Sequence, residues 1–239
     1  MKNAVITILS LLVLTLGGYI IYDNVIKENE QKKDNDVEKK NDEVSLDIVN
    51  NLFDRISNVG PCGESILELD NTLSIEEFDK KNNGVYISQY VVHSLFIDNL
   101  VNENKTENKY TMNVEDYKAE YEKLLGKKSV DLPESIRSGF VMFNLNGDIY
   151  DGEIIKGTGC GPSGKYLLDS YKSSNDTLTL TVIYVWKASD GKYSVDSSLD
   201  NAKEYTEEEI KKLDNLIKYD YNFTKKGSNY ILSSIGNSK

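Results

Sequence analysis

The chain offers few side chains for the commonest kinds of catalysis. His93 is the only histidine, and Cys62 and Cys160 are the only two cysteines. General acid–base chemistry near neutral pH most often uses histidine, whose unperturbed pKa is about 6.5. A zinc site made from four Cys and His side chains needs more of these residues than the chain contains. The sequence therefore predicts no catalytic residue, no cofactor-binding residue and no metal-binding residue.

The two cysteines lie in glycine-rich stretches, Cys62 within GPCG and Cys160 within GCG. In an exported domain, an isolated pair of cysteines is most simply a disulfide. Closing a loop of roughly 100 residues stabilises a fold by about 4 to 5 kcal/mol in the chain-entropy model. The alternatives are free structural thiols, or a nucleophilic thiolate beside His93. We predict a disulfide between Cys62 and Cys160.

Residues 159–166, GCGPSGKY, resemble the phosphate-binding loop of nucleotide-binding proteins. That loop needs Ser or Thr after the lysine to bind magnesium, and Tyr166 stands there instead. Residues 151–156 are also not the continuous apolar strand that precedes such a loop in a buried parallel sheet. We predict a glycine-rich structural loop and no nucleotide site.

Composition excludes other classes of protein. The 28 basic side chains are outnumbered by 39 acidic ones, giving a net charge of −11. A surface of this sign cannot neutralise phosphates, so nucleic acid is not an expected partner. The 16 Tyr and 6 Phe supply a core that a disordered chain lacks. The tyrosines either form a binding face or replace Phe in the core.

An apolar segment occupies residues 4–22, 19 residues without a charge. As a helix it is about 28 Å long, which matches the core of a bilayer. Tyr19 and Tyr22 stand at its far end, where aromatic side chains favour the interface. A cleaved signal peptide and a buried helix are the alternatives, but the run is long for a signal and no small-x-small site precedes Asp23. We predict an uncleaved anchor that contacts the lipid bilayer.

The sequence thus divides into a transmembrane anchor at residues 1–22, a charged spacer at residues 23–43 and a folded domain at residues 44–239. Lysines flank both ends of the anchor, so the positive-inside rule alone does not orient it. The very short amino-terminal tail and the cysteine pair favour an extracytoplasmic domain. The expected location is the cell membrane, with a single pass and the bulk of the chain outside.

Four segments show helical patterning: residues 45–56, 85–101, 113–125 and 206–217. Ser45 and Asn113 are candidate amino-terminal caps, and Gly126 is a stop signal. Thr206 with Glu209 has the spacing of a capping box. The segment at residues 85–101 is rich in β-branched and aromatic residues, and a strand is its alternative.

Strands predominate in the carboxy-terminal half. Three hairpins are expected, joining residues 140–145 to 148–155, 177–186 to 192–195, and 219–224 to 230–235. Asn144, Asn146 and Asp148 have the spacing that opens a calcium loop, but Ile149 stands where that loop needs Gly. The first hairpin explains these three residues better. We predict an α+β fold, with helices packed on a mostly antiparallel carboxy-terminal sheet.

The chain has a recognisable layout of five features. They are the anchor, the spacer rich in Lys, Asp and Asn, the helix ending at Gly126, the Gly-x-Cys-Gly turn and the final Tyr-rich hairpin. The chain resembles uncharacterised single-pass membrane-anchored extracytoplasmic proteins of low-GC Gram-positive bacteria. This resemblance implies location and layout, and it assigns no residue a role.

Two classes of function remain. The first is a non-catalytic module that binds an envelope protein or a small ligand, and the second is a cell-envelope hydrolase. A cleft with ionisable residues around His93 favours the hydrolase, and a Tyr-lined apolar groove favours the binding module. The missing catalytic parts favour the binding module.

Overall fold

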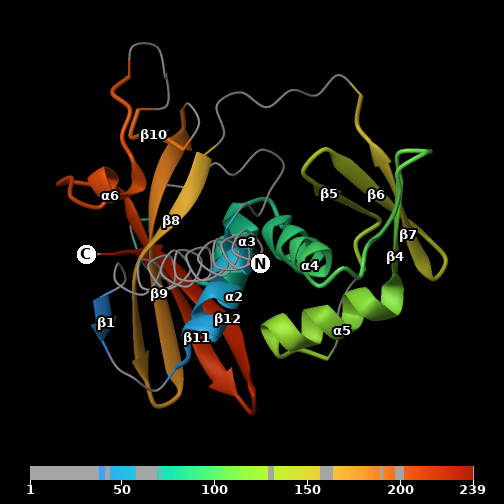
Figure 1. The fold of residues 1–239 in the computed structure, drawn as a ribbon. Coiled ribbons are helices and arrows are strands. Elements are labelled where there is room, and N and C mark those ends of the chain that lie inside the picture. Colours follow the sequence, from blue (N-terminus) through green and yellow to red (C-terminus); the bar gives the residue numbers. More distant parts are fainter. Residues whose placement is uncertain are drawn as a thin grey trace, which may run out of the picture. The chain divides into compact units, whose positions relative to one another are not determined.

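Antiparallel sheets and helices make up the described part of the chain (Figure 1). The computed structural model describes residues 44–57, 69, 71–128, 132–156, 164–188, 191–196 and 202–238, together with the backbone of residues 38–40. The class is α+β, as predicted. The helices are α2 (Leu46–Ile56), α3 (Ile75–Lys81), α4 (Tyr86–Ile97), α5 (Val114–Leu125) and α6 (Glu207–Ile210).

The larger sheet has the strand order β1-β8-β9-β11-β12-β2, with β10 paired to β9. Pairing is antiparallel from β8 to β2. Its strands are β1 (Glu38–Lys40), β2 (Leu73–Ser74), β8 (Gly164–Ser174), β9 (Thr177–Lys187), β10 (Tyr193–Ser194), β11 (Lys218–Lys226) and β12 (Asn229–Asn237). Three residues of the predicted spacer thus form strand β1.

The smaller sheet has the order β3-β4-β7-β6-β5 and is antiparallel throughout. Its strands are β3 (Asn102–Asn104), β4 (Lys109–Asn113), β5 (Ser135–Ser138), β6 (Val141–Asn146) and β7 (Ile149–Ile154). We expected one carboxy-terminal sheet, and this expectation was wrong. Strands β3 and β4 precede α5 and were not predicted. Their sequences are short and polar and show little of the apolar alternation that indicates a strand.

The predicted hairpins are present. Strands β6 and β7 pair as far as Asn146 and Ile149, so the turn is Gly147-Asp148, one residue later than expected. Strands β9 and β10 pair, and so do β11 and β12. The last hairpin closes with Lys226 opposite Asn229, so its turn is shorter than the five-residue loop expected from the sequence. Residues of this turn line the two pockets described below.

The helix predictions held, with differences in capping and length. Gly126 ends α5 in the left-handed conformation, with φ of 67°, and Thr206 and Glu209 form the expected capping box. Ser45 and Asn113 occupy the cap positions without a side-chain cap bond. Helix α6 is only one turn long and does not reach residue 217 as predicted.

Tyrosine replaces Phe in much of the core. The fully buried tyrosines come from both sheets and from α4 and α5: Tyr90, Tyr117, Tyr150, Tyr171 and Tyr221. Tyr221 donates a hydrogen bond to the hydroxyl of Tyr166 at 2.9 Å, inside the larger sheet's core. The high tyrosine content of the sequence therefore largely reflects core packing. It does not by itself indicate a binding face.

Residues 164–166 of the phosphate-loop-like motif begin strand β8. A nucleotide-binding loop needs a helix at this point. A Cβ on Gly164 would collide with the ring of Tyr184 on the neighbouring strand, so close strand packing accounts for this glycine. The other residues of the motif lie outside the described part.

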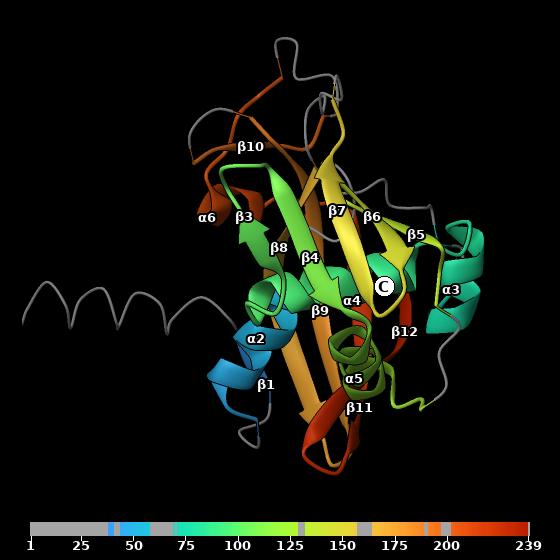
Figure 2. The ribbon, with the colours of Figure 1, turned by 90° about the vertical axis from the view of Figure 1, so that its right-hand side faces the viewer.

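Helices α4 and α5 connect the two sheets (Figure 2). Helix α5 contacts β12 of the larger sheet and β4 of the smaller one, while α4 contacts β5. Helix α4 also contacts α2, α3 and α5. Within the described residues, no helix is long and apolar enough to cross a membrane, and the predicted anchor lies outside them.

Candidate functional site

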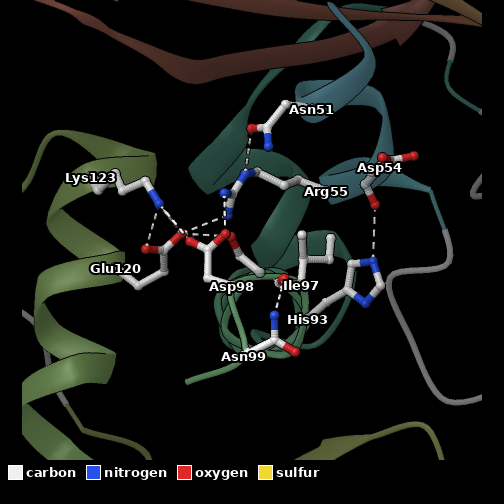
Figure 3. A network of polar contacts seen from close by, with 10 residues as sticks. Asn51, Asp54, Arg55, His93, Ile97, Asp98, Asn99, Glu120 and Lys123 are labelled. Atoms are coloured by element: carbon white, nitrogen blue, oxygen red, sulfur yellow. Dashed lines mark hydrogen bonds and ion pairs between the residues drawn. The ribbon is translucent and has the colours of Figure 1, made fainter. Parts of the chain in front are cut away.

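A buried polar cluster joins helices α2, α4 and α5 (Figure 3). The guanidinium of Arg55 donates hydrogen bonds through Nη1 to Glu120 Oε1 at 2.9 Å and through Nη2 to Asp98 Oδ1 at 2.6 Å. Its Nε donates to Asn51 Oδ1 at 2.9 Å. We call the set Arg55, Asn51, Ser94, Asp98, Glu120 and Lys123 the Arg55 cluster.

Lys123 and Ser94 complete the Arg55 cluster. Lys123 Nζ lies 2.8 Å from Asp98 Oδ2 and 2.9 Å from Glu120 Oε2. Ser94 Oγ donates a hydrogen bond to Glu120 Oε1 at 2.5 Å. Two cations therefore face two carboxylates. The net charge of the cluster is zero, which makes its burial tolerable.

The sequence of each helix explains why these groups meet. The face of α2 that buries Val49, Leu52 and Ile56 also carries Arg55 inward, at the last helical turn. Glu120 lies on the buried face of α5, between Tyr117 and Leu124. The exposed fractions of the Arg55 and Glu120 side chains are only 5% and 4%. Each charge needs the other here, because an unpaired buried charge is costly.

Asp98 directly follows α4 and forms ion pairs with both Arg55 and Lys123. Burial alone would raise the pKa of the Asp98 carboxyl, but hydrogen bonds from Arg55 and Lys123 outweigh it and hold the pKa below its usual range. The carboxylate is therefore ionised near neutral pH. Its ion pairs with Arg55 and Lys123 are therefore kept at that pH.

His93 lies on α4, next to the cluster but facing away from it (Figure 3). A ring nitrogen, Nε2, is 3.1 Å from the carbonyl oxygen of Asp54. Burial lowers the pKa of His93, although hydrogen bonds to the backbone carbonyls of Asp54 and Ser57 act in the opposite direction. Its contacts resemble those of a packed structural histidine that ties α4 to the end of α2.

An apolar pocket of about 260 Å³ lies beside the Arg55 cluster, between α2, α5 and the turn that joins β11 to β12. We call it the apolar pocket. Its walls carry apolar side chains and a few polar groups: Ile48, Leu52, Leu124 and Tyr230, with Asp47, Asn51, Arg55, Lys123, Ser228 and Asn229. Concave, mostly apolar sites with a small number of convergent polar groups are typical of ligand binding.

A second pocket of about 400 Å³ adjoins the first, and we call it the lysine pocket. Lys123 and Asn229 line both pockets, so the two are adjacent. The lysine pocket is more polar, with walls from Ala119, Glu122, Lys123, Gly126, Lys128, Lys226, Asn229 and Ile231. Lys226 Nζ donates a hydrogen bond to the carbonyl oxygen of Gly126 at 3.1 Å, which ties the hairpin to the end of α5.

The residues singled out in the sequence are not those of the pockets. His93 lines neither pocket. Cys62 and Cys160 lie outside the described residues, so their disulfide stays a prediction, which non-reducing mass spectrometry of protein from intact cells can test.

Sequence reasoning did not identify the Arg55 cluster or the two pockets. One signal was available, because Arg55 is one of only two arginines among 28 basic residues. Arginine is the residue of choice for buried ion pairs, so a lone arginine on an amphipathic helix indicates such a pair. The carboxylate partners come from two other helices and could not be identified from spacing.

In the described part of the chain, no three His, Cys, Asp or Glu side chains are grouped so that they could hold a metal ion. The chain was also compared with known proteins as a whole. No family model, no curated protein and no solved structure matches it.

Proposed function

We propose that this protein is a membrane-anchored extracytoplasmic binding module that holds a small ligand, or an apolar group of an envelope partner, in the apolar pocket. The observation that carries the proposal is the pocket itself. Its apolar walls come from Ile48, Leu52, Leu124 and Tyr230, and polar groups of the Arg55 cluster reach its edge.

The elements around the pocket support a preformed site. The ion pairs of Arg55 fix α2 against α4 and α5, and the hydrogen bond of Lys226 fixes the β11–β12 turn against α5. Binding sites on rigid elements lose less conformational entropy when a ligand enters. An apolar pocket that His93 does not line is also the arrangement that favours binding over catalysis.

The location rests on the sequence. The uncharged run at residues 4–22 supports an anchor in the bilayer, and the predicted cysteine pair supports an extracytoplasmic domain. The acidic charge and the polar spacer suit a domain that stays in solution near the membrane surface.

A fragment screen tests the binding function. Full-length protein in lipid nanodiscs is mixed with water-soluble aromatic and aliphatic fragments, and bound fragments are detected by ligand-observed NMR against empty nanodiscs. We expect binding that weakens by about tenfold or more in Ile48→Trp, because the larger side chain closes the pocket. Ile154→Trp is the matched control, since Ile48 and Ile154 are 39% and 40% exposed and only Ile48 lines the pocket.

The hydrolase alternative is tested separately. Peptidoglycan, peptide and ester substrates are incubated with the wild type and with His93→Ala. We expect no turnover from either protein. Turnover that disappears in His93→Ala, with an unchanged circular dichroism spectrum, contradicts the non-catalytic proposal.

The fragment screen has its own contradicting outcomes. Equal binding in wild type and Ile48→Trp, or no binding of any fragment, contradicts the assignment of the pocket.

A further inference from the structure

Two lysines of the lysine pocket have no carboxylate partner among the described residues. Lys128 is exposed and makes no ion pair or hydrogen bond with them, and Lys226 donates its hydrogen bond to the carbonyl of Gly126. An ammonium group carries three N–H donors, so both lysines keep donors for another acceptor. The third lysine, Lys123, is already neutralised by Asp98 and Glu120.

The position of these lysines has a partial structural explanation. A lysine near the carboxyl end of a helix interacts favourably with the unpaired carbonyls, and Lys226 does so at Gly126. This contact uses one donor of one lysine. It does not explain why Lys128 lines the same pocket in a chain whose net charge is −11.

The local charge balance limits what this pocket can bind. Glu122 also lines it and offsets one of the two unmatched lysines, which leaves a single positive charge. A monoanion suits that balance better than a doubly charged phosphate, because a second negative charge would meet Glu122 without a compensating cation. A carboxylate is the common monoanion that accepts charge-assisted hydrogen bonds from ammonium groups.

We propose that the two pockets form one site for an apolar carboxylate. The carboxylate contacts Lys128 and Lys226, and the apolar body lies against Leu52, Leu124 and Tyr230. This inference rests on the proposed binding function and names the ligand class for the same site. The ligand chemistry is shared by a free organic acid and by the terminal carboxylate of a peptide that ends in an apolar residue.

The test compares matched acids and amides. Full-length protein in nanodiscs is titrated with 4-phenylbutanoate and with its neutral analogue 4-phenylbutanamide, and also with the peptide Gly-Gly-Leu and its carboxamide. We expect the acid of each pair to bind about tenfold more tightly than the amide, as charge-assisted hydrogen bonds imply. The pair with the higher affinity identifies the source of the carboxylate.

Variants assign the preference to the two lysines. The double variant Lys128→Gln with Lys226→Gln is expected to bind acid and amide equally. Loss of the Lys226–Gly126 hydrogen bond affects acid and amide alike, so the ratio of the two affinities is the readout. Lys105→Gln is the matched control, since Lys105 is an exposed lysine in the segment between β3 and β4 and lines neither pocket.

The outcomes separate this inference from the proposed function. Equal affinity for acid and amide in the wild type overturns the carboxylate assignment, and so does a preference that survives in the double variant. Fragments of any charge still bind the apolar pocket in those cases, and the binding function stands. Loss of all fragment binding is the failure of the proposed function itself.

Discussion

At the scale of residues, the Arg55 cluster is the feature that decides how the candidate site is held. Arg55 and Glu120 are almost fully buried, and they form an ion pair at 2.9 Å. A buried pair of this kind gains little over an apolar replacement, but breaking it by removing one partner is costly. Stability measurements on single variants therefore test the cluster directly.

Glu120→Gln is expected to lower the free energy of unfolding by about 3 kcal/mol, because Arg55 then keeps a buried charge with only Asp98 to balance it. Glu115→Gln is the control on the same helix, since Glu115 pairs with Lys118 on the surface and its loss costs at most about 0.5 kcal/mol. Chemical denaturation of both variants gives the comparison. Similar costs for the two variants contradict the role of the cluster.

His93 gives the domain a dependence on pH. Its folded-state pKa is lowered, so the unfolded chain takes up a proton more readily than the folded one. The stabilisation is present above the unfolded pKa of about 6.5 and is lost as the pH falls through the lower folded pKa. We expect the free energy of unfolding to fall as the pH is lowered from about 7 to about 5. In His93→Gln, the free energy of unfolding should change less over the same pH range. An unchanged slope in the variant contradicts the assignment.

At the scale of elements, α2, α5 and the β11–β12 turn form the walls of the pockets. The helices differ in whether a side chain caps the amino terminus. Helix α3 begins with a capping box that the sequence analysis missed. Ser74 Oγ accepts a hydrogen bond from the Glu77 backbone N–H at 3.3 Å, and Glu77 Oε2 accepts one from the Ser74 backbone N–H at 3.0 Å. Ser45 occupies the same position of α2 and makes no such bond.

Ser74→Ala should therefore lower the free energy of unfolding by about 1 kcal/mol, whereas Ser45→Ala should cost less than about 0.5 kcal/mol. Both serines precede a helix and both changes remove only a hydroxyl, so the pair isolates the cap bond. Thermal unfolding at a fixed protein concentration measures the difference. An equal cost for both variants would show that the capping box does not stabilise α3.

The sequence predicted those elements whose signals are local. Helices α2, α4 and α5 and the hairpins β6–β7, β9–β10 and β11–β12 follow from periodicity, Gly126 and turn residues. Strand β8 was missed because its first residues resemble a glycine-rich loop, and β3 and β4 because they are short and polar. The pockets could not be predicted, since they depend on bringing residue 48 beside residue 230, and spacing along the chain does not encode that contact.

At the scale of the whole molecule, a binding domain is proposed to stand on a polar spacer beside the membrane. The spacer at residues 23–43 would set the distance over which a domain anchored by residues 4–22 can reach a partner. A domain anchored as proposed would meet envelope ligands at a raised effective concentration.

Membrane attachment is tested by alkaline carbonate extraction, which removes peripheral proteins. We expect the full-length protein to remain in the membrane fraction, because a 19-residue uncharged helix is long enough to span the hydrocarbon core. A chain that lacks residues 4–22 should be released. Release of the full-length protein, or a mature amino terminus near residue 23, contradicts an uncleaved anchor.

The central claim is that ligands occupy the apolar pocket. Intermolecular nuclear Overhauser effects between a bound fragment and methyl-labelled full-length protein in nanodiscs test it most directly. We expect contacts from the fragment to the methyl groups of Ile48, Leu52 and Leu124, which line the pocket. Contacts confined to other methyl groups, such as those of Val92 beside His93, would contradict it.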